Sequence, residues 1–455
     1  MGENNEYQQT RNGINTYHTL LQTAFFSFSF LLHIMYKSRS LIHFSMMYFV
    51  ISLFALFIAI NGFPEKVLGQ TKPPTGSSKK PTGKTSKSSS KSDSSKETAK
   101  PASATPRPSS GQTLPPSKPL EDAPTAGGTV KEANSLPRSP KRPSQALKFT
   151  AEERILPTTT GTLWGTLLVP TTATTTASVP IIFILNTNTL YNRDGISRHY
   201  HDSSNHAKYL AEALAAQGIA SFRYDTRGAG KSREAFVNEE FHDFERTISD
   251  ACLWVDSLRK DKRFSTLTIL GLSRSNDFGR EGSLAGIQVA YRQQADGLIM
   301  VAPDSRRWLR YLRAQAYQTF PEASAKIIDS VAGLLEEGRR PYIKPNEGII
   351  FDLMRYSLQN YILSLNKYDP IVEIAKLNIP IIGVHGTMDL TISDEYTRNL
   401  VAANPKAKFF SIKNMTFNLK NGEKDLSTPP QEKIKIPIMP EVVDLFTDFV
   451  LSLEK

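Results

Sequence analysis

From about Leu147 onward, the sequence predicts an α/β fold with a mostly parallel sheet that helices cover on both faces. Short apolar runs of the type found in buried parallel strands recur along this part of the chain. They are PIIFIL (180–185), IASFRY (219–224), LTILGL (267–272), GLIMVA (297–302), PIIGVHG (380–386) and KFFSI (408–412). Segments with helical spacing of apolar residues separate them, among them 207–218 and 244–258. Strands that alternate with helices pair in parallel, which is the basis of this prediction.

Two further elements extend this architecture. Residues 149–156 and 162–170 are typical of a β-hairpin with its turn at Thr-Thr-Thr-Gly. Several helical segments lie between about 304 and 375, in the interval between two predicted strands. We expect them to form a lid above the carboxyl ends of the strands, where sheets of this type bind ligands. The folded domain is therefore expected to span 147–455, with its lid at about 304–375.

A basic linker is expected before this domain, at 70–146. Between Thr71 and Arg142 the chain has 14 Lys and Arg residues against 5 Asp and Glu, and no aromatic residue. Such a segment buries too little apolar area to offset the entropy of the chain, so we expect it to be disordered. Most of the net charge of +11 belongs to this linker. We therefore expect neither a folded basic groove nor nucleic-acid binding.

The segment 46–69 is typical of a secretory signal peptide. Its 13 apolar or near-apolar residues at 48–60 are too few for a membrane span, and Gly69 is a plausible cleavage site. We therefore expect a secreted or extracellular protein, with membrane anchoring through this N-terminal segment as the alternative. Residues 1–45 are either a signal-anchor extension or an over-long gene model, and the sequence leaves this choice open.

Three stretches, in order along the chain, carry a resemblance to a known superfamily. ASFRYDTRGAGKS (220–232) is similar to a structural turn after the second parallel strand, 250–271 to the helix and strand before a nucleophile, and 360–393 to the segment with a catalytic acid. On these stretches the chain resembles the α/β-hydrolase superfamily, within it the secreted bacterial-type serine hydrolases of the serine-aminopeptidase and esterase/lipase groups. The resemblance covers roughly 150–455. It implies an α/β-hydrolase fold and a Ser-His-Asp triad.

The resemblance places the nucleophile at Ser273, directly after the strand 267–272. The family's nucleophile elbow is Gly-x-Ser-x-Gly, but here the sequence reads GLSRSNDFGREG. Removing residues 274–280 would restore the motif as GLSEG. The seven residues are either a real insertion, which would move an oxyanion N–H away from the serine, or a gene-model error. An ordinary loop hydroxyl is the alternative interpretation of Ser273.

The acid matches Asp389 in GTMDLT, with Asp304 as a less favoured alternative. The base has been replaced: aligning NMTFNLK (414–420) with the family's Met-Asn-His turn places Phe417 at the histidine position. Every histidine of the chain precedes Asp389. An imidazole from elsewhere would have to reach both Ser273 and Asp389, which is geometrically improbable for the candidates His199, His201, His206 and His385.

The oxyanion loop has changed as well. In NTNTLYNRDG (186–195), Thr187 and Thr189 stand where the resemblance implies glycines. A β-branched residue makes a close backbone approach to an oxyanion harder than glycine does. No metal or other cofactor is expected, because the histidines of HYHDSSNH (199–206) fit no single strand or helix face and Cys252 is the only cysteine.

Two functions from different classes follow from these residues. The first is a catalytically impaired descendant of ester or peptide hydrolases that binds a small acyl or aromatic ligand, or a partner protein. The second is an active serine hydrolase of carboxylic esters or peptides with a non-standard base or a faulty gene model. Phe417 favours the first, because removal of 274–280 would not restore the missing imidazole.

Overall fold

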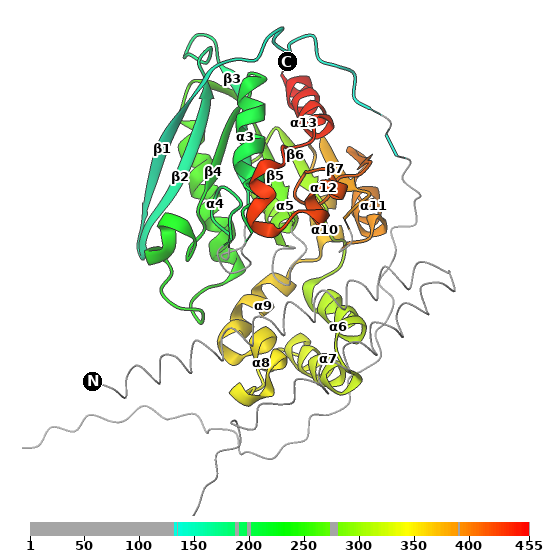
Figure 1. Cartoon of the computed structure of the whole chain (residues 1–455). Coiled ribbons are helices and arrows are strands. Elements are labelled where there is room, and N and C mark those ends of the chain that lie inside the picture. The colour runs from blue at the N-terminus through cyan, green and yellow to red at the C-terminus, as the bar shows by residue number, and fades with distance from the viewer. Residues whose placement is uncertain are drawn as a thin grey trace, which may run out of the picture. The chain divides into compact units, whose positions relative to one another are not determined.

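The computed structural model describes residues 132–133, 135–186, 191–197, 202–273, 281–389 and 392–454 (Figure 1). All of them belong to the second of two compact units, Pro106–Lys455. The predicted extension at 1–45, the signal segment at 46–69 and most of the predicted linker lie outside the described residues. Within the described part, no helix is both long and apolar enough to cross a membrane.

An eight-stranded sheet forms the centre of the domain, with strand order β1-β2-β4-β3-β5-β6-β7-β8. The strands β1 and β2 pair as an antiparallel hairpin, β2 pairs antiparallel with β4, and all other neighbours are parallel. The strands are β1 (Phe149–Thr158), β2 (Gly161–Pro170), β3 (Val179–Leu185), β4 (Ala220–Tyr224), β5 (Phe264–Leu272), β6 (Gly297–Val301), β7 (Ile381–Gly386) and β8 (Ala407–Ile412). This order and these directions are those of the α/β-hydrolase fold, which confirms the predicted fold class.

Helices cover both faces of the sheet because the apolar strand residues point alternately to either side. On β3, Ile182 and Ile184 pack with α3 (His206–Ala216) and α13 (Pro440–Leu453) in one core. Phe183 and Leu185 belong to the other core, which contains α4 (Phe244–Arg259) and α5 (Glu281–Arg292). The predicted helices at 207–218 and 244–258 are therefore both present.

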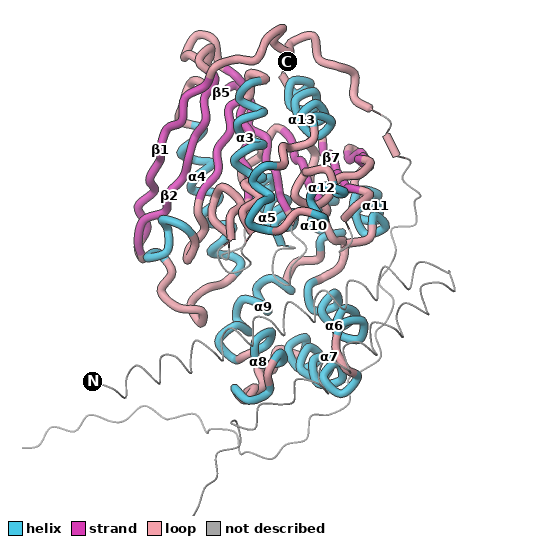
Figure 2. The backbone as a smooth tube through the Cα atoms, in the orientation of Figure 1, coloured by secondary structure: helices cyan, strands magenta, loops and turns pink. Residues whose placement is uncertain are grey.

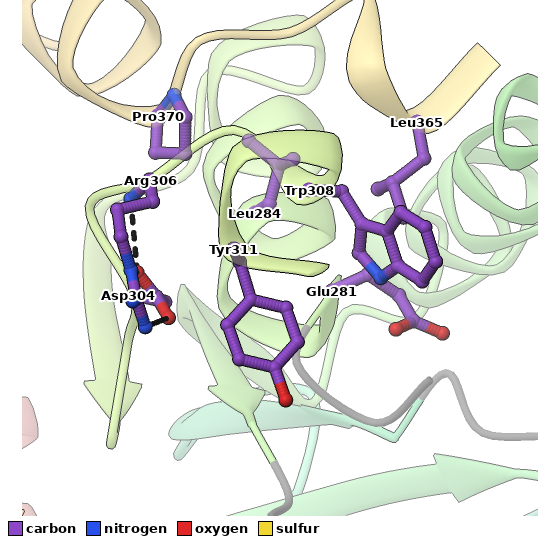
Figure 3. Close-up of a pocket in the computed structure, with 8 residues that line it drawn as sticks. All are labelled: Glu281, Leu284, Asp304, Arg306, Trp308, Tyr311, Leu365 and Pro370. Carbon is purple, nitrogen blue, oxygen red and sulfur yellow. Dashed lines mark hydrogen bonds and ion pairs between the residues drawn. The ribbon is translucent and has the colours of Figure 1, made fainter. Parts of the chain in front are cut away.

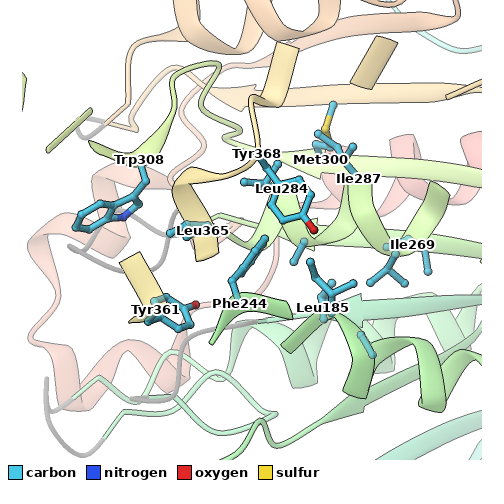
Figure 4. Close-up of a cluster of buried hydrophobic side chains, with 14 of the residues drawn as sticks. Leu185, Phe244, Ile269, Leu284, Ile287, Met300, Trp308, Tyr361, Leu365 and Tyr368 are labelled. Carbon is cyan, nitrogen blue, oxygen red and sulfur yellow. The ribbon is translucent and has the colours of Figure 1, made fainter. Parts of the chain in front are cut away.

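A helical insertion connects β6 to β7, as the sequence predicts. Figure 2 shows α6 to α9 grouped together beyond one end of the sheet. Trp308 and Leu365 from this insertion pack against Leu284 and Phe244 of the main body in one apolar cluster (Figure 4). The elements of the insertion are α6 (Trp308–Thr319), α7 (Glu322–Glu336), η3 (Pro345–Glu347), α8 (Ile349–Met354), η4 (Tyr356–Leu358), α9 (Gln359–Asn366) and α10 (Pro370–Ala375).

The domain is completed by short elements near the strand ends. A 3-10 helix, η2, follows β4, and α11 lies between β7 and β8, while the remaining elements follow β8. Their bounds are η2 (Gly230–Ala235), α11 (Asp394–Ala402), α12 (Gly422–Ser427) and η5 (Pro430–Lys435).

Part of the predicted linker contacts the folded domain. Arg142 forms ion pairs with Asp444 and Asp448 of α13, and the N–H of Ser139 donates to the Asp448 carboxylate at 2.8 Å. Further toward the N-terminus, the N–H of Ala133 donates to the Phe409 carbonyl of the edge strand β8 at 2.9 Å. The packed part of the chain thus begins before the expected boundary at 147.

Candidate active site

Ser273 lies at the carboxyl end of β5, where the sequence places the nucleophile. Its side chain is 1 % exposed. The Ser273 hydroxyl donates to Ser283 Oγ at 2.8 Å and accepts the backbone N–H of Ser283 at 3.1 Å. Since α5 begins at Glu281, Ser283 lies in its first turn, where backbone N–H groups lack partners inside the helix. Ser273 therefore acts on α5 as an N-cap residue does, although seven residues separate it from the helix.

Close packing of α5 on β5 brings the two glycines of the interrupted elbow motif near each other. A Cβ atom on Gly282 would lie 1.9 Å from the carbonyl oxygen of Leu272, and one on Gly271 would lie 2.7 Å from that of Gly282. Both positions thus require glycine for a backbone approach that any side chain would block. Gly271, Ser273 and Gly282, the defining residues of the shortened motif, therefore lie close together although residues 274–280 separate them in sequence. The predicted effect of those residues on the oxyanion N–H concerns a segment outside the described residues.

The turn with the predicted acid packs against the loop with the predicted base position. Asp389 is buried after β7, and its N–H donates to the Gly386 carbonyl at 2.9 Å. One residue earlier, the N–H of Met388 donates to the Met415 carbonyl at 3.0 Å. Asp389 and Phe417 are thus carried by two segments in direct contact, which is the arrangement that an acid and a base of a triad require.

Phe417 is half-buried in a loop that is fixed on both sides of it. Thr416 Oγ1 and the Asn418 amide both donate to Asp425 Oδ2, at 2.9 and 3.2 Å. Lys420 is fully buried, and its ammonium donates to the carbonyls of Ser204 and Lys433. Burial lowers the pKa of Lys420 to about 8. At the predicted base position, this loop carries the benzyl side chain of Phe417, which neither accepts nor donates a proton.

The histidines that the structure describes near the sheet are engaged elsewhere. His206 begins α3, with Nδ1 3.0 Å from Ser204 Oγ. His385 lies within β7, with Nδ1 3.4 Å from Thr397 Oγ1, and burial lowers its pKa. His199 and His201 lie outside the described residues, as do Thr187 and Thr189 of the predicted oxyanion loop.

His242 is a half-buried residue that the sequence reasoning did not consider. Its ring stacks on Tyr361 of the insertion at 5.3 Å between centroids. The Tyr361 hydroxyl donates to Glu281 Oε1 at 3.0 Å, so His242 is linked through one side chain to the first residue of α5. Burial lowers the pKa of His242 to about 4, which keeps the ring neutral at pH 7. No local sequence signal could have shown this contact, because Tyr361 is far from His242 along the chain.

A small cavity lies where the insertion meets the carboxyl ends of β5 and β6 (Figure 3). Its volume of about 30 Å³ suffices for a water molecule but not for a substrate. Within it, Arg306 pairs with the alternative acid, Asp304, at 2.7 Å. The lining residues are Glu281, Leu284, Asp304, Arg306, Trp308, Tyr311, Leu365 and Pro370.

Two comparisons with known proteins find similarity to serine hydrolases over part of the chain. Residues 196–341 match the family model described as serine aminopeptidase, S33, a range that includes Ser273 but ends before Asp389 and Phe417. Esterase EstD of Thermotoga maritima is 25 % identical over 189 residues, which are 41 % of this chain and 42 % of the relative. The match thus spans less than half of that relative's length. Part of the chain is therefore similar to serine aminopeptidases and to an esterase, and the domain as a whole has the α/β-hydrolase fold.

Two solved structures illustrate the similarity in fold. Est1E from Butyrivibrio proteoclasticus, with bound ferulic acid, is 17 % identical with a TM-score of 0.43, over 66 % of this chain and 96 % of that one. An acylaminoacyl peptidase of Pyrococcus horikoshii is 14 % identical, also with a TM-score of 0.43, over 68 % of this chain and 43 % of that one.

Proposed function

We propose that this protein is a catalytically impaired member of the serine hydrolases that binds a small acyl or aromatic ligand at the carboxyl end of its sheet. The observation that carries the proposal is the hydrogen bonding of the Ser273 hydroxyl. It is buried and makes two hydrogen bonds with Ser283, one of which caps α5. A nucleophile needs its hydroxyl proton directed at a base, whereas Ser273 directs a proton at another serine.

The replacement of the base supports the same proposal. Without the histidine, a triad enzyme retains only a residual rate of about 10³–10⁴-fold over water, which comes from binding and from the oxyanion hole. Attack by Ser273 would also require it to give up its bond to the Ser283 N–H, and loss of an N-cap costs about 1 kcal/mol. Both effects act against acyl transfer, while neither removes the fold that surrounds a ligand site.

Labelling with a fluorophosphonate probe tests this proposal. The probe reacts only with an activated serine, so we expect no labelling of the folded full-length protein. Ser273→Ala is the control for any signal. Labelling that is lost in this variant would show an activated Ser273 and overturn the impairment.

An active serine hydrolase with a non-standard base is the second candidate. It is favoured by the close packing of Gly271 and Gly282, the two glycines of the predicted elbow, and by the contact between the Asp389 turn and the Phe417 loop. Ester or peptide turnover by the wild-type protein that Asp389→Asn and Ser273→Ala both abolish would establish it.

Secretion is a separate part of the proposal. The length and apolar composition of 46–69 support export, with anchoring by the same segment as the alternative. Fractionation of expressing cells would decide: protein in the medium with a shortened N-terminus supports secretion, and full-length protein in the membrane fraction supports anchoring.

A further inference from the structure

Asn186 directly follows β3, at the edge of the sheet where Ser273 follows β5. The last pair of residues between β3 and β5 is Leu185 with Gly271, so Asn186 lies one residue beyond this pair and Ser273 two residues beyond it on the neighbouring strand. Both strands run in the same direction. Asn186 and Ser273 therefore lie at the same edge of the sheet, on adjacent strands.

The side chain of Asn186 is buried without hydrogen bonds. It is 7 % exposed, and among the described residues neither Oδ1 nor Nδ2 has a hydrogen-bond partner. A buried polar group without a partner loses its hydration and gains nothing in return, which is why such groups are rare in folded proteins. An amide with both its donor and its acceptor unused is a group from which a ligand can gain two hydrogen bonds.

We infer that Asn186 recognises a primary carboxamide, so that the site proposed above prefers carboxamides to esters. This inference rests on the proposed ligand-binding function. A primary carboxamide presents an N–H and a C=O side by side and pairs with the Asn186 amide through two hydrogen bonds. An ester offers only acceptors, so it would leave Oδ1 of Asn186 buried and unpaired.

The surroundings agree with a neutral polar ligand. The first turn of α5 lies at this edge, but its Ser283 N–H is capped by Ser273 and the turn contains Glu281, so it offers less to an anionic ligand than an uncapped helix end would. Within the neighbouring insertion, the buried rings of Trp308 and Tyr311 line the small cavity together with Glu281 of α5 (Figure 3). A benzene ring with a carboxamide substituent combines both properties.

Calorimetric titration of the full-length protein with benzamide and with methyl benzoate tests the inference, using the wild type and Asn186→Leu. Thr268→Val is the matched control, because Thr268 Oγ1 is also buried without a partner among the described residues but lies within β5 rather than at its end. Asn186→Leu is expected to weaken benzamide binding by about tenfold or more through the loss of two hydrogen bonds. Methyl benzoate binding, and both ligands in Thr268→Val, should change less than threefold.

Equal benzamide affinity in the wild type and Asn186→Leu would overturn the inference. Binding of methyl benzoate without benzamide would also overturn it, yet would leave the proposed ligand-binding function intact. If the wild type binds neither compound, the inference and the proposed function both fail.

The melting temperature without ligand gives an independent readout. Asn186→Leu should melt at or above the wild type, because it removes an uncompensated buried polar group. A fall of several degrees that is absent from Thr268→Val would show that the amide has a structural role, which would overturn the inference.

Discussion

The backbone N–H of Ser283 donates a hydrogen bond of 3.1 Å to Ser273 Oγ, although residues 274–280 separate Ser273 from the helix that contains Ser283. The serine at the predicted nucleophile position thereby caps the helix whose N-terminus would assist catalysis in an intact elbow. The Ser273 hydroxyl thus stabilises the start of α5, at the position where a serine hydrolase would use it as the nucleophile. The first two predictions below follow from this relationship.

Replacement of Ser273 should destabilise the domain. Ser273→Ala removes the acceptor for the Ser283 N–H, and we expect a loss of about 1 kcal/mol in the free energy of unfolding. Chemical denaturation measures this loss. Ser273→Thr, which keeps a hydroxyl oxygen as acceptor for the Ser283 N–H, is the control and should lose less. An alanine variant as stable as the wild type would show that the capping bond is not important in solution.

Restoring both altered elements should restore turnover. Phe417→His combined with deletion of 274–280 supplies a base and a continuous Gly-x-Ser-x-Gly, and general-base catalysis typically contributes 10²–10⁴-fold. We expect hydrolysis of 4-nitrophenyl acetate to rise by about 10²-fold or more over the wild type. Phe417→His alone should gain less, because Ser273 remains bonded to Ser283. The absence of any gain would mean that the oxyanion loop or the ligand site has also changed beyond rescue.

Glu239 should restrain the helical insertion. It lies between η2 and α4 and accepts hydrogen bonds from Arg355, whose Nε is 2.7 Å from Oε2, and from the Ser357 hydroxyl. The Glu239 and Arg355 side chains are 28 % and 30 % exposed, so Glu239→Ala should cost no more than about 1 kcal/mol of stability. Hydrogen exchange across 349–366 should nevertheless become faster.

Glu337→Ala is the matched control for this experiment. It breaks an ion pair with Arg339 that lies within the insertion and does not connect it to the main body. Exchange across 349–366 should therefore stay at the wild-type rate. Equal exchange in both variants would contradict a restraining role of Glu239.

Stability should fall when the pH drops from about 6.5 to about 4. Burial lowers the pKa of His242 from 6.5 to about 4, so in this window the unfolded state binds a proton that the folded state does not. The free energy of unfolding is therefore unaffected by His242 above pH 6.5. It falls by up to about 3 kcal/mol as the pH drops toward 4. Melting curves from pH 4 to 7 measure it. His242→Gln should show a shallower pH dependence, and an unchanged slope would argue against His242 as its source.

Many elements of this fold could be predicted from the sequence because their signals are local. A parallel strand buried on both faces reads as a continuous apolar run, so β3 and β5 could be identified directly. Ser273 could be located because it follows such a run, and the carboxyl end of a strand has a fixed place in this architecture. The start of the packed chain could not be predicted. By composition Arg142 belongs to the linker, and only its ion pairs with Asp444 and Asp448 show that it contacts the domain.

The sequence by itself determined the class of fold and the chemical identity of the side chains at the predicted triad positions. Phe417 lacks a proton acceptor in any conformation, which is a property of the residue alone. Only the tertiary structure decided what Ser273 contacts, that His242 stacks on Tyr361, and that the Asn186 amide is buried without partners among the described residues. The physical reason is that a hydrogen bond or ring contact depends on distances of a few ångströms between segments remote in sequence. Here those distances are set by how closely α5 packs on β5 and how the insertion meets the main body.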